Sequence, residues 1–328
     1  MSVWNDRLSL GFNYYKSYVN NMLAYKTLGG VSGLRNYWSN EGKMENQGFD
    51  VAAVAKVMAL KDFSWEISAS VGHYKNEVTA LPDNDKTVYT SVYGGEVMTK
   101  VGNPVGLFYG YKTQGVFATS EEAAETDLRN GSKNGSAFRA GDVHFSDLVA
   151  DGVIDNKDKD VIGNPNPDVF GNFGTSLHYK NWTLDAFFSY SLGNDIYNYQ
   201  RAVLESGNSY YNQTTAMLNR WTSEGQLTSI PRVEYGDRMG NARFSDRWIE
   251  DGSYLKLKTL SLSYRFPFNL TFLQGITVWG AANNLFTCTK YLGSDPELSI
   301  SGNPIYQGID RGLLGHGRSF VLGVKINL

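Results

Sequence analysis

Large apolar residues recur at every second position in several stretches of this chain. In the final run, GRSFVLGVKINL, the alternating apolar positions are Phe320, Leu322, Val324, Ile326 and Leu328. The same period of two runs through residues 7–16, 63–74 and 182–193. This period indicates β-strands with one apolar and one polar face. Each run has about the 9–11 residues that a tilted strand needs to cross a bilayer.

Further strands are expected at 47–60, 105–117, 169–180, 253–266 and 275–286 and within 87–101. Very short turns join some neighbours, at Lys61-Asp62 and Lys180-Asn181. The other connections are long, at 20–46, 118–168, 194–252 and 287–316, and one helix is expected at 120–131. Short turns at one end and long loops at the other are typical of outer-membrane barrels. The pattern therefore predicts an all-β fold, an antiparallel transmembrane β-barrel that is partial at roughly ten strands, with long extracellular loops.

The composition agrees with this fold and argues against nucleic-acid binding and an intrachain disulfide. The chain carries 35 Gly, 21 Tyr, 17 Phe and 7 Trp, as expected for a strand-rich protein with many turns. Its net charge is -3 and it has no Lys/Arg cluster, so no nucleic-acid partner is expected. Cys288 is the only cysteine, which excludes an intrachain disulfide. The N-terminal run MSVWNDRLSLGF lacks the pattern of a signal peptide.

An acidic stretch within the long loop 118–168 is similar to a calcium-binding loop. Asp147, Asp151, Asp155 and Asp158 take positions 1, 5, 9 and 12 of an EF-hand-like spacing. Calcium prefers such oxygen ligands, so a Ca²⁺ site is one interpretation. Val149 at position 3 offers no side-chain oxygen, so an acidic turn without metal is the other. No further cofactor is expected.

Aromatic residues in the loops are candidates for stacking on sugar rings: Tyr37, Trp38, Tyr210, Tyr211 and Trp221. The alternative is that these rings pack the long loops against each other or against a partner protein. The sequence contains no G-x-S-x-G motif and no phosphate-binding loop, and its four histidines are scattered singly. The chain is therefore not expected to be an enzyme.

Three extended motifs follow one another along the chain: DGVIDNKDKDVIGNPNPDVFGNFG, RWIEDGSYLKLKTLSLSYRF and NNLFTCTKYLGSDPE. Together with FYGYKTQGVF and the terminal run, they resemble the C-terminal part of the SusC/RagA family of TonB-dependent outer-membrane transporters. The resemblance covers about residue 105 to the end. It implies that 1–328 is the C-terminal part of such a barrel, without the plug domain and the first barrel strands. The family usually ends on an aromatic residue, whereas this chain ends on Leu328.

The family resemblance also implies a role in active uptake at the outer membrane, in contact with its lipid. Members of the family import glycan fragments or peptides, with a SusD-like lipoprotein as an extracellular cap. The TonB complex energises them through the N-terminal region. From the residues alone two other possibilities stay open. One is a soluble secreted β-sandwich that binds glycan or calcium, and the other is a complete small pore.

Overall fold

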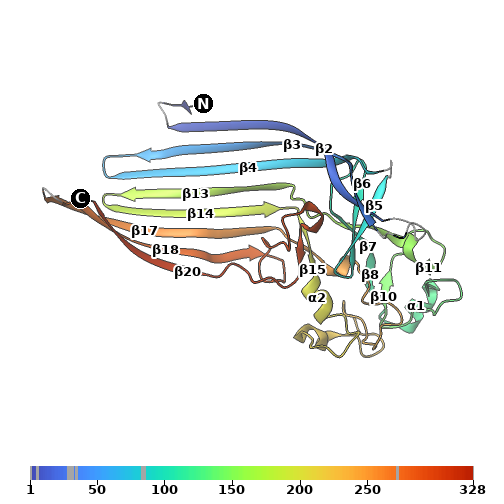
Figure 1. Cartoon of the computed structure of the whole chain (residues 1–328). Helices are drawn as coiled ribbons and strands as arrows, with labels where there is room; N and C mark the ends of the chain where they lie inside the picture. Colours follow the sequence, from blue (N-terminus) through green and yellow to red (C-terminus); the bar gives the residue numbers. More distant parts are fainter. Residues whose placement is uncertain are drawn as a thin grey trace.

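The computed structural model describes residues 2–4, 7–27, 33, 36–82, 86–270 and 273–327. Figure 1 shows a broad, curved sheet of long strands with a smaller lobe of short elements at one end. The sheet has nine strands in the order β1-β2-β3-β4-β13-β14-β17-β18-β20. All neighbouring pairs are antiparallel. The sheet is not closed, because β1 and β20 form its two edges.

The strands of the main sheet are β1 (Ser2–Val3), β2 (Leu8–Thr27), β3 (Asn36–Ala59), β4 (Phe63–Ala80), β13 (Val169–Tyr179), β14 (Trp182–Leu192), β17 (Tyr254–Leu270), β18 (Leu273–Thr289) and β20 (Ser319–Asn327). The connections at 60–62 and 180–181 are very short, as predicted. The predicted loop 20–46 is largely strand instead, because the β2–β3 hairpin continues to the pair Thr27↔Asn36. Leu328 lies outside the described residues.

The lobe combines several small sheets and two short helices. One sheet holds β5 (Thr87–Val92), β6 (Gly95–Lys100), β7 (Leu107–Tyr111) and β12 (Lys159–Gly163). Others pair β8 (Thr113–Val116) with β10 (Val143–Phe145), β9 (Arg129–Asn130) with β11 (Val153–Ile154), and β15 (Asp195–Asn198) with β16 (Ile249–Asp251) and β19 (Ile309–Asp310). The predicted helix at 120–131 is present as the shorter α1 (Ser120–Thr126), and α2 (Tyr199–Leu204) was not predicted. No helix in the described residues has the length and apolarity to cross a membrane.

Two predicted strand regions, 87–101 and 105–117, belong to the lobe and not to the main sheet. They form β5 to β8, and each of these strands has only four to six residues. That length is short of the roughly nine residues needed to cross a bilayer. In β7 both faces are buried, which suits a strand inside a protein core rather than one between lipid and water.

The hydrophobic core lies in the lobe. One cluster packs around Phe117, Phe145 and Ile154, and a second packs around Phe108, Trp248 and Ile309. A third, smaller cluster at Val78, Leu81 and Val105 lies where β4 enters the lobe. In the part of the main sheet farther from the lobe, these described clusters have no members. The lobe therefore has its own packed interior, whereas the part of the long strands farther from the lobe belongs to none of these clusters.

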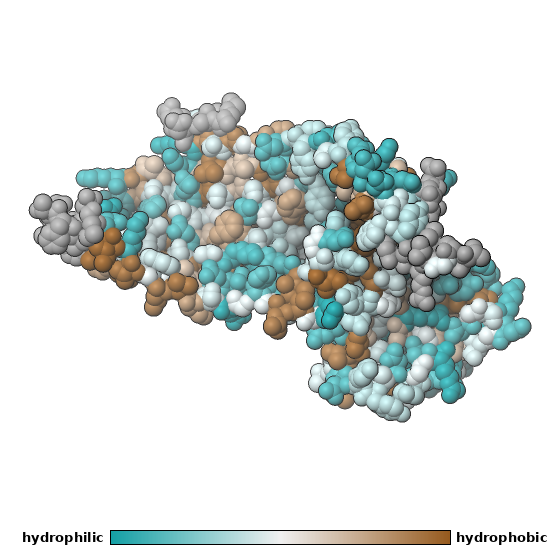
Figure 2. All heavy atoms as spheres, in the orientation of Figure 1, coloured by the Kyte–Doolittle hydropathy of each residue, from teal (hydrophilic) through white to brown (hydrophobic). Residues whose placement is uncertain are grey.

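The main sheet has one apolar and one polar face because its register keeps like residues in line. Apolar rows cross the strands, for example Trp65–Leu177–Leu184–Leu262, with neighbours paired directly. On β20, Leu322 is 88% and Val324 62% exposed. Figure 2 shows hydrophobic residues gathered along the side of the sheet where β18 and β20 lie. An apolar face that is open in this way suits contact with lipid.

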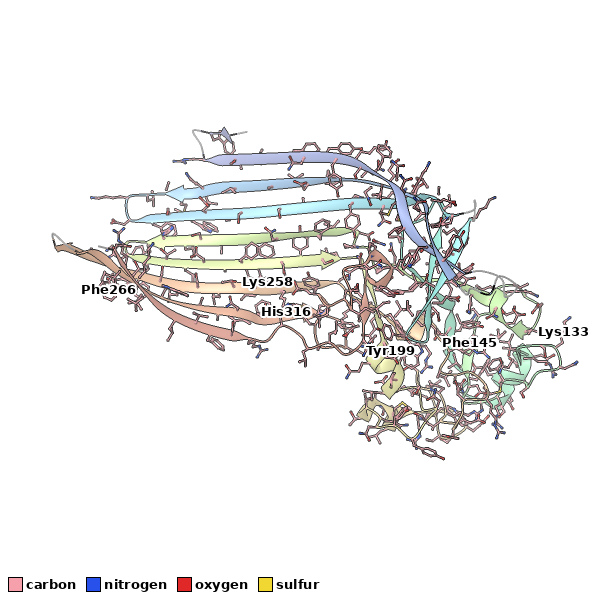
Figure 3. The ribbon with its side chains drawn as sticks, viewed as in Figure 1. Lys133, Phe145, Tyr199, Lys258, Phe266 and His316 are labelled. Carbon is pink, nitrogen blue, oxygen red and sulfur yellow. The ribbon has the colours of Figure 1, made fainter. Side chains whose placement is uncertain are left out.

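Aromatic rings form a band near the short turns. Tyr179, Trp182 and Tyr264 are consecutive cross-strand partners at that end. The rings of Trp182 and Tyr264 are 4.7 Å apart, and those of Tyr264 and Phe266 are 4.6 Å apart. Figure 3 shows Phe266 at the end of the sheet away from the lobe. Aromatic girdles of this kind are typical of the membrane–water interface.

Glycines in the strands make room for rings from neighbouring strands. At Gly171 an added Cβ would meet the carbonyl oxygen of Ser70 and, at 2.8 Å, the Tyr190 hydroxyl. That hydroxyl crosses Gly171 to donate a hydrogen bond to the Ser70 carbonyl oxygen at 3.0 Å. Tyr190 of β14 therefore packs across β13 and is hydrogen-bonded to β4, which links the three strands.

Gly171→Val is expected to lower the free energy of unfolding by about 1–3 kcal/mol, because backbone atoms must move to admit the side chain. Gly11→Val is the matched control, since the nearest atom to its added Cβ is the Ala52 carbonyl oxygen at 3.9 Å. We expect the control to change stability by less than about 0.5 kcal/mol. Urea unfolding of the protein in detergent micelles measures both. Equal losses in the two variants would contradict the packing role of Gly171.

Candidate functional site

The polar face of the main sheet carries charged and hydroxyl groups at the level of Asp185. Glu66, Ser176, Asp185 and Ser261 are consecutive cross-strand partners. The hydroxyls of Ser176 and Ser261 donate to the two carboxylate oxygens of Asp185, at 2.6 and 3.2 Å. The Lys56 position pairs with Glu66 on the other side. This row gives the polar face a hydrated, hydrogen-bonding surface.

A compact charged cluster joins β17 to the loop that leads to β20. The ammonium of Lys256 lies 2.8 Å from Asp295 Oδ2 and 2.7 Å from Glu297 Oε2, and its side chain is 2% exposed. Lys258 Nζ contacts the same Glu297 at 2.6 Å. His316 donates its backbone N–H to Asp295 Oδ2 at 3.1 Å. Figure 3 shows Lys258 and His316 close together toward the lobe end of the sheet.

The charged cluster is built for structure rather than for metal binding. Among the described residues, the ligand-type group close enough to hold one ion is Asp295, Glu297 and His316. Two ammonium groups already neutralise the two carboxylates. A divalent ion would have to displace the buried Lys256, so this group carries no metal proposal.

Burial by itself would raise the pKa of Asp295, but hydrogen bonds from Lys256 and from the backbone of His316 and Glu297 lower it to about 2. The pKa of Glu297 is also lowered, with burial opposing and the two lysines favouring the charged form. Both carboxylates are therefore ionised at neutral pH.

The attachment of this loop is expected to weaken only in strong acid. A carboxyl with a lowered pKa contributes stability above its ordinary value of 3.8, and that contribution is lost as the pH falls toward about 2. Hydrogen exchange of the backbone amides in 293–318, followed from pH 6 to pH 2, measures the change. Asp295→Asn should reduce the step between about pH 4 and pH 2 and leave the part that comes from Glu297. Full protection of the wild-type loop at pH 2 would contradict the assignment.

The four aspartates of the predicted calcium loop bind backbone N–H groups of their own turn. Asp147 accepts from Gly152 N at 2.7 Å, and Asp151 accepts from Val153 N at 3.0 Å. Asp155 and Asp158 form a reciprocal cap around a short 3-10 turn, residues 156–158. In the described chain these four carboxylates are not among the groups placed close enough to share one ion. The calcium site stays a prediction, and the observed bonds are those of an acidic turn.

The five aromatic candidates occupy different settings. Tyr37 and Trp38 lie on β3, and Trp38 is 67% exposed. Tyr210 is 88% exposed and its ring stacks on Tyr235, with centroids 4.6 Å apart. Tyr211 is 73% exposed and lines a pocket of the lobe. Trp221 donates its indole N–H to Ala118 O at 3.1 Å and lies against Gly141, which is a packing role.

Sequence reasoning missed the residues that join separate motifs. Glu250 accepts from Arg201 Nη1 at 2.5 Å and, through its other oxygen, from Leu292 N at 2.8 Å. Trp248 is 1% exposed, and two guanidinium groups contact its ring, with Arg247 4.7 Å and Arg201 5.6 Å from the ring centroid. One hint was present in the sequence: the motif RWIEDGSYLKLK contains two lysines, and the motif YLGSDPE contains two acidic residues. Their pairing requires the fold.

Comparison with known proteins gives one consistent answer. TonB-dependent receptor P3 of Formosa agariphila is 30% identical over 99% of this chain and 33% of the relative. TonB-dependent receptor SusC of Bacteroides thetaiotaomicron is 26% identical over 99% of this chain and 31% of the relative. The chain is a homologue of SusC-type TonB-dependent receptors. It spans about a third of the length of these relatives, and like them it is an outer-membrane protein.

Solved structures support the fold of this SusC-type chain. The structure titled "Structure of the RagAB peptide transporter" has a TM-score of 0.80 at 23% identity and covers 99% of this chain and 34% of its own. No protein-family model matches the sequence. The predicted resemblance to the SusC/RagA family and the predicted antiparallel barrel are confirmed. The matched relatives are named as receptors and transporters, which agrees with the prediction of a non-enzyme.

Proposed function

We propose that this chain forms part of the barrel wall and the extracellular lobe of an outer-membrane nutrient importer. The observation that carries the proposal is a long antiparallel sheet whose apolar face, in its part away from the lobe, belongs to none of the described core clusters. Its opposite face presents Glu66 and Asp185. Such a sheet suits lipid on one side and a water-accessible interior on the other. The single sheet also differs from a β-sandwich, whose apolar faces pack on each other.

The open edges of the sheet require further strands. Each unpaired N–H or C=O group in lipid costs several kcal/mol, so an open sheet is not viable in a bilayer. The first edge and β20 therefore pair with other barrel strands, which the greater length of the relatives supports. The plug and the segment that contacts TonB would belong to that remainder. This requirement disfavours a complete small pore made of this chain alone.

The lobe lies at the long-loop end of the strands, opposite the short turns, and this end of a barrel faces the outside. A SusD-like lipoprotein would cap the lobe there. The cargo would be a glycan fragment or a peptide, as the family resemblance implies, and one structural neighbour is titled a peptide transporter. TonB would supply the energy through the remainder of the receptor.

The test uses the full-length receptor that carries this chain, expressed in its own outer membrane. A barrel should migrate differently in gels before and after boiling, and it should copurify with a capping lipoprotein. Uptake of labelled cargo should stop when the proton gradient is collapsed or TonB is deleted. A protein that partitions as soluble and shows no gel shift would refute the proposal.

A further inference from the structure

A pocket in the lobe is walled by aromatic rings from segments far apart in the sequence. Tyr93 comes from the β5–β6 turn, Tyr199 begins α2, Tyr211 follows α2, and Phe244 lies in a later loop. The rings of Tyr93 and Tyr199 are 5.3 Å apart. Tyr197 lies beneath and packs on Phe244 at 4.7 Å. Figure 3 places Tyr199 where the lobe joins the sheet.

Tyr93 occupies a backbone position that tyrosine rarely adopts. It and Gly94 are the two central residues of the β5–β6 hairpin, with φ of +46° and +76°. Such two-residue turns strongly prefer Asn-Gly, and a bulky residue at positive φ costs free energy. Backbone strain of this kind concentrates at functional sites. Tyr93 therefore occupies the pocket although a two-residue turn of this type prefers asparagine at its position.

The surroundings of Tyr93 hold its ring in one orientation. Its hydroxyl accepts a hydrogen bond from Arg311 Nη1 at 3.2 Å, and the guanidinium lies 5.3 Å from the ring centroid. Its carbonyl oxygen accepts from the hydroxyl of Tyr197 at 2.9 Å. A ring fixed before binding loses little conformational entropy when a ligand stacks on it.

The rest of the lining is uncharged and combines polar residues with small apolar ones. Ser206, Asn208 and Ser209 are the polar lining residues besides the tyrosines, and none of the lining side chains is acidic or basic. The volume is about 240 Å³, below the roughly 300–1,000 Å³ of pockets that enclose drug-sized ligands. The pocket thus suits one small ring with flat apolar faces and hydroxyl groups at its edge.

We propose that this pocket binds one uncharged pyranose ring of an oligosaccharide, stacked on Tyr93, Tyr199 and Tyr211. The C–H faces of the sugar would lie on the rings, and its hydroxyls would bind Ser206, Asn208 and Ser209. The lining carries no charged side chain of its own, and Arg311 at its edge already binds the Tyr93 hydroxyl, so an uncharged ligand fits the pocket better than a charged peptide terminus. This inference rests on the proposed import function and selects a saccharide as the cargo.

Binding of neutral oligosaccharides to the full-length receptor in detergent tests the proposal. Calorimetry would use hexasaccharides of glucose, mannose, xylose and galactose, with an uncharged, capped hexapeptide for comparison. We expect at least one saccharide to bind and the peptide not to bind. Tyr211→Ala and Tyr93→Asn should each weaken that binding about tenfold or more, which corresponds to about 1.4 kcal/mol.

The variants separate a binding role from a structural one. Tyr93→Asn restores the preferred Asn-Gly turn, so the lobe should unfold at the same temperature as the wild type or higher. Tyr235→Ala is the matched control, an exposed tyrosine that stacks on Tyr210 outside the pocket lining. It should leave affinity within about twofold, a change of roughly 0.4 kcal/mol.

Three results would overturn the proposal: no saccharide of the panel binds, the peptide binds in preference, or Tyr235→Ala weakens binding as much as Tyr211→Ala. The receptor would still be an importer if it showed the gel shift and TonB-dependent uptake described above. Failure of the pocket is therefore distinguishable from failure of the proposed function.

Discussion

Lys256→Met is expected to weaken the attachment of the loop 290–318 to β17 by about 3–5 kcal/mol. The ammonium of Lys256 is buried and lies between Asp295 and Glu297. Methionine keeps most of the side-chain volume but removes the charge. Asp295, which is 4% exposed, then stays buried without its main counter-ion. An uncompensated buried charge costs far more than a lost surface pair.

Lys258→Met is the matched control. Its side chain is 30% exposed, and among the described residues its salt bridge is to Glu297. We expect a loss of about 1 kcal/mol or less, as for partly exposed ion pairs. Hydrogen exchange of the loop amides, combined with urea unfolding, measures both variants. Similar small losses at Lys256 and Lys258 would show that the buried pair does not anchor the loop.

A double variant isolates the charge effect. Lys256→Met combined with Asp295→Asn leaves one carboxylate, Glu297, which still pairs with Lys258. The loss of stability should then be smaller than in Lys256→Met alone, because the buried unpaired charge is gone. A loss equal to the sum of the two single variants would point to packing, not charge, as the cause.

The long strands of the main sheet were predictable because each face meets a uniform environment. In 63–74 and 182–193 the alternation of apolar and polar residues follows the faces that the register creates. The strands of the lobe were misassigned because burial on both faces removes the alternation, as in β7. The outer part of the β2–β3 hairpin was missed for the opposite reason. Its second strand there, residues 36–46 (NYWSNEGKMEN), is mostly polar on both faces, so its sequence carries no apolar period.

The residues that join separate motifs, and the aromatic pocket, could not be predicted because their members are far apart in the sequence. Lys256 and Asp295 are 39 positions apart, and only the β17–β18 hairpin brings their motifs together. Tyr93 and Tyr211 come from loops without any shared motif. Predicting Tyr93 at the pocket would also have meant placing a tyrosine in a turn that prefers asparagine. The acidic motif at 147–158 could be recognised in the sequence. In the structure its carboxylates bind backbone N–H groups of the same turn and do not bring distant segments together.

Leu260→Arg is expected to destabilise the folded barrel by about 2–4 kcal/mol. Leu260 lies near the middle of β17, beside Ala186 near the middle of β14, on the apolar face. A guanidinium there would have to enter the hydrocarbon region, where its desolvation is costly. Refolding of the full-length receptor into lipid vesicles, titrated with urea, measures the change.

Ser261→Arg is the control that decides which face meets lipid. Ser261 is the next residue on the same strand, points to the opposite face, and donates to Asp185 at 3.2 Å. An arginine there would meet the Asp185 carboxylate in a hydrated interior, so we expect less than about 1 kcal/mol of loss. If Ser261→Arg proved costly and Leu260→Arg harmless, the lipid and water faces would be exchanged. The membrane assignment of the sheet depends on this difference between two adjacent residues.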